Sequence, residues 1–330
     1  MIAMDSYDLG TSMIEYLMYR KERCSVQDLS SRQPWDVFVS AYNDSDRVRQ
    51  LFDATPAIRK RWLMASEYGY EESDAPVGAE IAWLSEVDEA AAIVDGFESL
   101  NVDWQTVKLC VDITGFMRPH ILFLTKYLAR RGVAKFDVVY SEPVKYKSKE
   151  KTRFALDDPF EVRQVSGFEG THVTNVSGDL LVIGAGYDDP LVSRVAGNKE
   201  AARIVFLYGL PSLSADMYQE SIMRMSQPLD AVEGRLFRGD GIAFASANDP
   251  FVTAGVLSGL CGDARSKHGV TNIYLSPLGT KPQTLGFALA YLKEFEGTPS
   301  SILFPFSKTY ARETSTGIGR IWTYHIELSA

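Results

Sequence analysis

The stretch that decides the fold is residues 107–131, VKLCVDITGFMRPHILFLTKYLARR, where an apolar run passes through a small polar turn into a helical pattern. The run at 107–113 is continuous rather than alternating, as expected for a strand covered by helices on both faces. Apolar residues return at helical spacing over 118–131. This stretch therefore predicts a strand–turn–helix unit of an α/β protein.

The same kind of unit recurs along the chain. Other apolar runs predict strands at 37–40, 136–140, 180–184, 203–208, 242–245, 272–275, 301–304 and 321–327. Helical segments are predicted between them, at 45–54, 215–225, 250–261 and 282–294. Since strand–helix alternation is typical of a doubly wound sheet, we expect an α/β fold with a mainly parallel, Rossmann-like sheet.

Three of these units repeat in the same order, which indicates an internal duplication. The pairs are DVFVSAYNDS (36–45) with GIAFASANDP (241–250), CVDITGFMRP (110–119) with IYLSPLGTKP (273–282), and VVYSEPVKY (138–146) with ILFPFSKTY (302–310). Three matches in order predict two pseudo-duplicated Rossmann-like halves. We place them at 34–200 and 201–330, after an N-terminal accessory helix within residues 1–33.

Composition excludes several classes of protein. The net charge of −9 disfavours general nucleic-acid binding, which needs a cationic field. There is no run of 18 apolar residues and no basic-then-apolar signal sequence, so we expect a cytoplasmic protein with no membrane segment. The three cysteines and four histidines lack disulfide-framework or metal-ligand spacing, and no metal is predicted.

Polar residues follow the predicted strands at the ends where α/β sheets bind ligands. Ser40, Asn43 and Asp44 close the first strand, and the helix that follows offers free N–H groups to an anion. Helix capping by Asp44 or Ser45 is the alternative explanation, and for Ser45 it is the one we favour.

The next two predicted strands are followed by charged and hydroxyl side chains that could bind or react with a ligand. Asp112, Thr114 and Arg118 follow the strand at 107–113, and Arg118 would place a planar cation in the first turn of the helix. Glu142 directly follows the strand at 136–140, which makes it the best-placed carboxylate for acid–base chemistry. A solvated loop glutamate paired with a nearby lysine is the alternative, and it is the one we favour for Glu142.

In the second half, a glycine, a hydroxyl group and an ammonium group are consecutive at Gly279, Thr280 and Lys281. They come just before a predicted helix, and the proline at position 282 is favourable in its first turn. The spacing is not that of a Walker A motif. We predict an anion-binding turn here, facing Asn43 or Arg118 across a shared cleft.

A glycine-rich turn at 181–190, LVIGAGYDDP, begins like a dinucleotide fingerprint. The third glycine of that fingerprint is missing, and ordinary NAD(P) binding by this loop is not expected. No cofactor is predicted.

Taken together, the strand-end turns resemble those of the CARF and SAVED families, Rossmann-like sensor domains of prokaryotic defence systems that bind cyclic oligonucleotides. The matching segments are 40–44, 114–115, 246–249 and 279–281, and the first half departs from the pattern at 116–118. The resemblance implies a nucleotide-like or phosphate ligand and a sensor or regulatory role in antiviral defence. Because no nuclease or protease module is recognised, it also implies a protein partner or a homo-oligomer.

Two alternatives leave open whether the protein is an enzyme. Residues 36–40 with 43–47 also resemble the opening of TIR-type domains, some of which cleave NAD, and the catalytic residue would be one of Glu67, Glu71, Glu72 and Glu80. The other alternative is a non-catalytic structural subunit of an enzyme complex, with the N-terminal helix and residues 68–83 as its interface.

Overall fold

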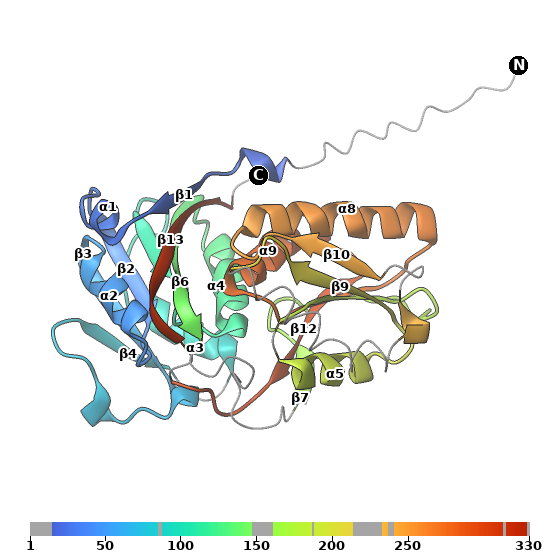
Figure 1. Ribbon diagram of the computed structural model, residues 1–330, viewed down its shortest axis with the longest axis horizontal. Coiled ribbons are helices and arrows are strands. Elements are labelled where there is room, and N and C mark those ends of the chain that lie inside the picture. The colour runs from blue at the N-terminus through green and yellow to red at the C-terminus, as the bar shows by residue number, and fades with distance from the viewer. Residues whose placement is uncertain are drawn as a thin grey trace, which may run out of the picture.

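The computed structural model describes residues 15–84, 88–146, 161–186, 188–213, 233–236, 241–312 and 315–328. The helix predicted at 215–225 lies outside these residues. The described chain forms two sheets, and helices α4 (Arg118–Arg130) and α9 (Lys281–Ala290) pack against each other between them (Figure 1).

The first sheet has seven strands. In spatial order they are β1 (Lys21–Cys24), β13 (Ser315–Glu327), β6 (Lys135–Tyr146), β5 (Leu109–Asp112), β2 (Trp35–Ala41), β3 (Ala57–Ala65) and β4 (Glu80–Leu84). The five strands from β6 to β4 pair in parallel, whereas β13 pairs antiparallel with both β6 and β1. The helices connecting the parallel strands are α2 (Asp46–Ala54), α3 (Glu89–Glu98) and α4.

The second sheet has six strands. Their order is β10 (Ile242–Ala245), β9 (Arg203–Gly209), β8 (Leu180–Gly184), β11 (Ile273–Pro277), β12 (Ser300–Phe306) and β7 (Glu161–Gln164). All pair in parallel except β7, which is antiparallel to β12. Helices α5 (Asp189–Asn198), α8 (Pro250–His268) and α9 connect them.

The α/β class predicted from the sequence is confirmed, but the prediction of a mainly parallel sheet is corrected. There are two sheets, and both are mixed, because antiparallel strands close one edge of each. Apolar periodicity identifies a strand but says nothing about its direction, and the sequence therefore could not reveal these antiparallel edges.

The parallel strands of the two sheets run in the same order. If the parallel strands of each sheet are numbered by their order in the chain, the spatial order is 3-2-1-4-5 in both sheets. These strands are β4-β3-β2-β5-β6 in the first sheet and β10-β9-β8-β11-β12 in the second. The predicted matches of 110–119 with 273–282 and of 138–146 with 302–310 fall on strands in equivalent positions. We call each sheet with its connecting helices one half of the protein. Strands β7 and β8, residues 161–164 and 180–184, already belong to the second sheet, so these halves differ from the predicted ranges 34–200 and 201–330.

The third predicted match, of β2 with β10, is wrong. Strand β2 lies between β5 and β3 in the middle of its sheet, whereas β10 is an edge strand. The counterpart of β2 in chain order is β8. The two similar turns also differ in what their side chains do: Asp249 caps α8 by accepting the N–H groups of Phe251 and Val252, whereas no side chain caps α2 after β2.

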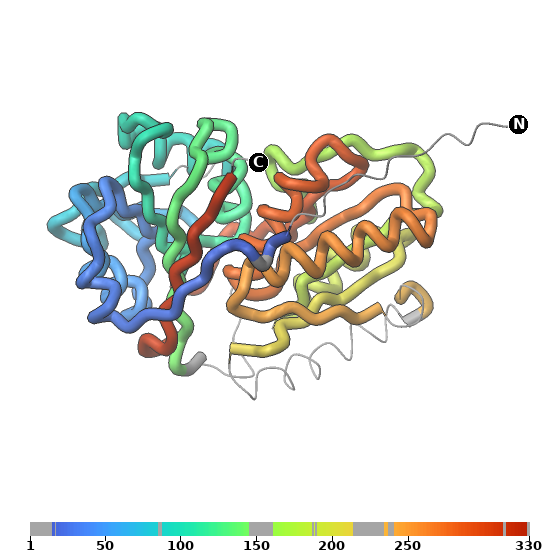
Figure 2. The backbone as a smooth tube through the Cα atoms, turned by 90° about the horizontal axis from the view of Figure 1, so that it is seen from above, coloured from blue at the N-terminus to red at the C-terminus, as the bar shows by residue number. Residues whose placement is uncertain are grey.

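The two halves exchange one strand each. Strand β7 follows β6 in the chain but pairs with β12, and β13 follows β12 but pairs with β6 (Figures 1 and 2). Each half thus completes the sheet of the other. The crossing from β12 back to β13 is described over residues 307–312, where the Tyr310 N–H donates to the Glu67 carbonyl of the first half at 2.9 Å.

The predicted N-terminal helix is also corrected. In its place are a short 3-10 turn, η1 (Tyr16–Met18), then strand β1, then the helix α1 (Val26–Ser30). Pairing of β1 with β13 outweighs the helical spacing of the apolar residues, and Ser25 starts the helix with a capping box.

This N-terminal segment crosses from one half to the other, as Figure 2 shows. The Tyr16 hydroxyl donates to Glu294 at 2.5 Å, and Lys21 forms an ion pair with Asp249 at 2.7 Å. Both contacts are with the second half, while β1 belongs to the first sheet. The segment is therefore packed within the chain rather than available as a helix for a partner.

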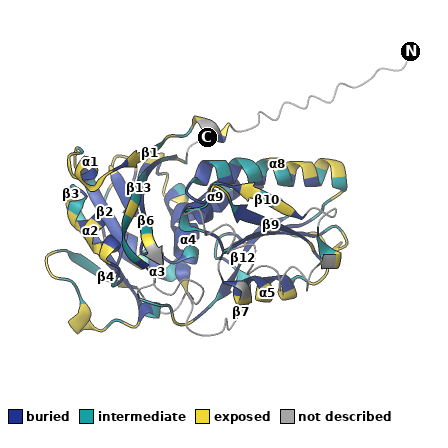
Figure 3. Ribbon diagram, in the orientation of Figure 1, coloured by how far each residue is buried: buried dark blue, intermediate teal, exposed yellow. Residues whose placement is uncertain are grey.

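The core lies around the central strands (Figure 3). Every residue of β5, β8 and β11 is buried, in agreement with their continuous apolar sequences. The edge strands β4 and β10 expose Trp83 and Phe244. None of the helices in the described ranges is long and apolar enough to cross a membrane.

A histidine on β13 ties that strand to the first sheet and gives a pH prediction. His325 Nδ1 lies 2.7 Å from Asp137 Oδ1 on β6, and the hydrogen bond to Asp137 raises the pKa of His325 above its ordinary 6.5. A group whose pKa is raised in the folded state stabilises the fold fully at pH values below its pKa in the unfolded chain. This stabilisation is lost as the pH rises through its pKa in the folded state.

We therefore expect His325→Gln to remove part of the loss of stability that sets in as the pH rises above the ordinary histidine pKa of 6.5. Urea unfolding at several pH values measures this, with His268→Gln on α8 as the control. An unchanged pH profile in His325→Gln would contradict the assignment.

Candidate anion-binding site

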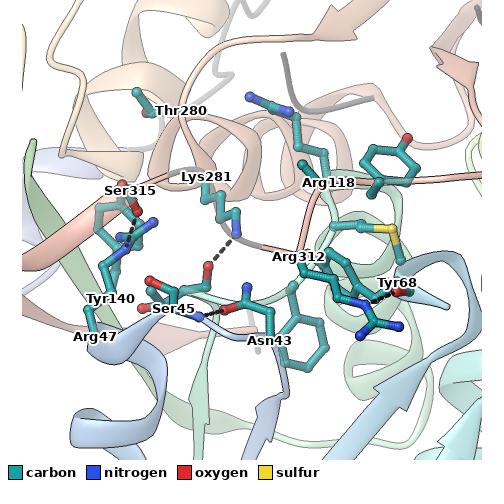
Figure 4. A pocket seen from close by; sticks show the side chains of 15 residues that line it. Asn43, Ser45, Arg47, Tyr68, Arg118, Tyr140, Thr280, Lys281, Arg312 and Ser315 are labelled. Carbon is teal, nitrogen blue, oxygen red and sulfur yellow. Dashed lines mark hydrogen bonds between the residues drawn. The ribbon is translucent and has the colours of Figure 1, made fainter. Parts of the chain in front are cut away.

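A small cavity of about 60 Å³ lies where the carboxyl ends of the first sheet meet the start of α9 (Figure 4). Its walls come from the turns after β2, β3 and β5, from β6, from α9, and from the crossing between β12 and β13. The lining residues are Asn43, Ser45, Arg47, Tyr68, Thr114, Phe116, Met117, Arg118, Tyr140, Thr280, Lys281, Tyr310, Ala311, Arg312 and Ser315. The cavity thus belongs to both halves.

Three helices begin at this cavity. Ser45 is the N-cap of α2, Met117 that of α4 and Thr280 that of α9, and all three residues line the cavity. The start of a helix carries partial positive charge and N–H groups without helical partners, which favours a bound anion.

Four cationic side chains line the same cavity: Arg47, Arg118, Lys281 and Arg312. Arg47 is 6% exposed and donates from Nε to the Ser315 hydroxyl at 3.0 Å. Within the described ranges, neither Arg47 nor Lys281 forms an ion pair with a carboxylate. A buried cation without a carboxylate is costly, so the cavity is suited to an anionic ligand.

The environment of Lys281 reflects this surplus of positive charge. Burial, with repulsion from Arg47 and Arg118, holds the pKa of the Lys281 ammonium well below its usual range, against a smaller attraction from the Asp112 carboxylate that raises it. Its amine donates to the Thr114 carbonyl, as Figure 4 shows. A bound anion would favour the charged form of this amine.

Arg118 and Lys281 occupy equivalent positions in the two halves. Each is the first residue of its helix, and each is followed by a proline. Arg118 Nε donates to the Gly279 carbonyl at 2.8 Å, while Lys281 donates to Thr114 in the opposite half. At the cavity, the cation of each half therefore donates a hydrogen bond to a backbone carbonyl in the turn of the other half.

Ser45 differs from the sequence expectation. The expected capping by Ser45 is not found, since its side chain makes no cap hydrogen bond to α2. Its hydroxyl is buried without a partner among the described residues. The Asn43 side-chain oxygen instead accepts the Ser45 N–H at 3.0 Å. An unpartnered buried hydroxyl in the cavity wall is a hydrogen-bonding group for a ligand.

Five of the ten residues proposed from the sequence come together at this cavity. They are Asn43, Thr114, Arg118, Thr280 and Lys281. The predicted juxtaposition of the Thr280–Lys281 turn with Asn43 and Arg118 is present. Thr280 caps α9 in a capping box with Gln283, so its hydroxyl also has a structural role.

Three of the other proposed residues support the cavity without lining it. Ser40 donates to the buried Asp112 carboxylate at 2.8 Å, and Asp112 also accepts the Thr114 N–H at 2.8 Å. Burial raises the pKa of Asp112. Gly279 contributes its carbonyl to Arg118, and a Cβ there would lie 2.4 Å from the Gln283 side-chain oxygen.

Asp44 and Glu142 are not in the cavity wall. Asp44 is half-buried, and its carbonyl accepts from Arg49 at 3.2 Å. Glu142 is 3% exposed and accepts from Asn248 at 2.9 Å, Arg320 at 2.5 Å and Trp322 at 2.7 Å. The suggested solvated loop is therefore wrong, and Glu142 instead joins β6, β13 and the second half.

Sequence reasoning missed Arg47 and the residues from the β12–β13 crossing. A cation in the first turn of a helix is unfavourable to the helix dipole, and this signal could have identified Arg47. Arg312 and Ser315 gave no local signal, because only the exchange of β13 brings them to the first sheet.

A second, larger cavity of about 450 Å³ adjoins the first and shares Met117 and Tyr310 with it. It contains Glu67, His120 and the ion pair of Glu89 with Arg163. Within the described residues, no cluster of three histidine, cysteine or acidic side chains is arranged to hold a metal ion.

Comparison with known proteins identifies no family for this chain. No family model matches it, and no curated protein does. A solved structure of a GsuK mutant is similar at 12% identity with a TM-score of 0.21. That alignment covers 84% of this chain and 66% of the other, just under two thirds of its length. At this TM-score the likeness supports no argument about fold or function.

Proposed function

We propose that this protein binds a phosphate-bearing, nucleotide-like ligand in the cavity between its halves. The observation that carries the proposal is the pair of cations Arg47 and Lys281, which lie together without a carboxylate partner in the described structure. The starts of α2, α4 and α9 add to the positive potential of the cavity. Phosphate matches both the size and the charge of such a site.

Our proposal is that the ligand is sensed rather than turned over. Glu142, the carboxylate proposed from the sequence for acid–base chemistry, accepts hydrogen bonds from three donors and does not line the cavity. The equal order of the parallel strands supports two Rossmann-like halves. The resemblance to CARF and SAVED turns then favours a sensor or regulatory subunit in prokaryotic antiviral defence, acting through a protein partner or a second copy.

A hydrolase is the second candidate, and one observation favours it. Of the four glutamates considered, Glu67 alone is in the wall of a described cavity, with Oε1 3.8 Å from His120 Nε2. Glu80 is instead paired with Arg59 and Arg61. Release of nicotinamide from NAD by the pure protein, lost in Glu67→Gln, would support this candidate over sensing.

Ser45→Ala tests the anion site in titrations with inorganic phosphate and pyrophosphate followed by calorimetry. We expect the variant to bind about two- to tenfold more weakly, because a hydrogen bond contributes about 0.5–1.5 kcal/mol. Its stability without ligand should not fall, since the hydroxyl has no partner among the described residues.

Ser276→Ala is the matched control. Ser276 on β11 also has a buried hydroxyl without a described partner, but it is not in the cavity wall. Its substitution should leave phosphate affinity unchanged. The proposal fails if the wild-type protein binds neither anion at low ionic strength, where electrostatic attraction is least screened.

A further inference from the structure

The larger cavity has the size of an organic subsite. At about 450 Å³ it falls within the range of roughly 300–1,000 Å³ typical of small-molecule pockets. It shares Met117 and Tyr310 with the anion-binding cavity, so the two spaces are neighbours along the β12–β13 crossing. Met117 and Tyr310 thus belong to the walls of both cavities.

The wall of the larger cavity contains polar atoms without partners. His120 on α4 is 3% exposed, and Ser307 on the crossing is 6% exposed. His120 Nδ1 and the Ser307 hydroxyl oxygen are buried with no hydrogen-bond partner among the described residues. Such atoms come from two separate elements and suit a ligand with its own donors and acceptors.

Unlike its neighbour, this cavity has no surplus of positive charge, because its wall contains the carboxylates of Glu67, Asp88 and Glu89 together with the cations Arg163 and Lys308. Arg163 forms two hydrogen bonds with Glu89, at 3.0 and 2.6 Å, and its guanidinium lies 3.7 Å from the centre of the Phe306 ring. Burial lowers the pKa of His120, which keeps the imidazole neutral near pH 7 with one donor and one acceptor. An uncharged ligand group with both kinds of hydrogen-bonding atom matches these walls.

We propose that the larger cavity holds the nucleoside of a single nucleotide whose phosphate occupies the anion-binding cavity. This inference rests on the proposed function and specifies its ligand as a nucleoside monophosphate. The aromatic rings of Phe306 and Tyr310 offer apolar surface to the base, while His120 and Ser307 bind its polar edge or the sugar. One nucleoside-sized cavity beside one phosphate-sized cavity favours a mononucleotide over a cyclic oligonucleotide.

Calorimetry with a defined panel tests the inference: the four common nucleoside 5′-monophosphates, the free nucleosides, inorganic phosphate and a cyclic dinucleotide. We expect at least one monophosphate to bind about tenfold or more tightly than inorganic phosphate, which corresponds to one or two added hydrogen bonds. His120→Leu and Ser307→Ala should each reduce that advantage and leave the affinity for inorganic phosphate unchanged.

His172→Leu, on a half-buried histidine outside both cavities, is the control for loss of an imidazole. Thermal melts verify folding, and Ser307→Ala alone decides the matter if His120→Leu does not fold. The inference is overturned if phosphate binds but no monophosphate exceeds it, if the cyclic dinucleotide binds more tightly, or if the variants weaken phosphate binding equally. Absence of binding to phosphate and to every nucleotide would overturn the proposed function as well.

Discussion

Lys281→Met is expected to weaken phosphate binding by about ten- to a hundredfold. Lys281 is the partly buried cation at the start of α9, and a hydrogen bond to a charged group contributes about 1.5–3 kcal/mol. Methionine keeps most of the volume and apolar contact of the lysine stem but cannot carry charge. Titration of the variant with inorganic phosphate and pyrophosphate measures the loss.

The same substitution is expected to stabilise the ligand-free protein at neutral pH. Burial and two arginines lower the pKa of Lys281 in the folded state, while the unfolded lysine keeps its ordinary 10.5. Between the two values the unfolded state binds more protons, so the contribution of Lys281 to stability rises with pH across that window. At pH values below that window the lysine is charged in both states, and the full cost of burying its charge lowers the stability of the fold. Lys281→Met removes that cost.

Opposite changes in binding and stability distinguish a ligand site from a structural lysine. Lys108→Met, at an exposed position before β5, is the control and should change neither quantity. If Lys281→Met lost stability and kept its phosphate affinity, Lys281 would be a structural residue that joins the halves through the Thr114 carbonyl.

Glu142→Ala is expected to lower the free energy of unfolding by about 3 kcal/mol, because it removes one partner of a buried ion pair. The substitution leaves the side chains of Asn248, Arg320 and Trp322 without their shared acceptor. Arg320 is partly exposed, and solvation of its guanidinium moderates the cost. Urea unfolding measures the change.

Glu327→Ala, at an exposed position at the end of β13, is the matched control and should be close to neutral. Phosphate affinity should be unchanged in Glu142→Ala under conditions where the variant is folded. Loss of binding or of activity from a fully stable Glu142→Ala protein would return Glu142 to the role of a catalytic group.

Local chemistry made much of this structure predictable. Continuous apolar runs located β5, β8 and β11, because strands buried on both faces have no polar alternation. The rule that ligands bind at the carboxyl ends of strands selects both Thr114 and Lys281 as candidates, and in the structure the Lys281 amine donates to the Thr114 carbonyl.

Long-range pairing was not predictable in the same way. Strand β3 carries charged residues at its start, and the apolar run of β4 at 81–84 is so short that it fits a helix as well as a strand. The N-terminal segment has helical spacing but pairs with β13, some 300 residues away in the chain. A carboxylate at a strand end, such as Glu142, looks the same in sequence whether it faces a cavity or a buried arginine.

The strand exchange also has a consequence for how the protein is made. Sheets formed early in translation are normally completed by neighbouring segments as they leave the ribosome. Here β6 must wait for β13, whose residues 315–327 are synthesised about 170 residues later. Until then β6 has an unpaired edge, the kind of surface on which nascent chains aggregate or recruit chaperones.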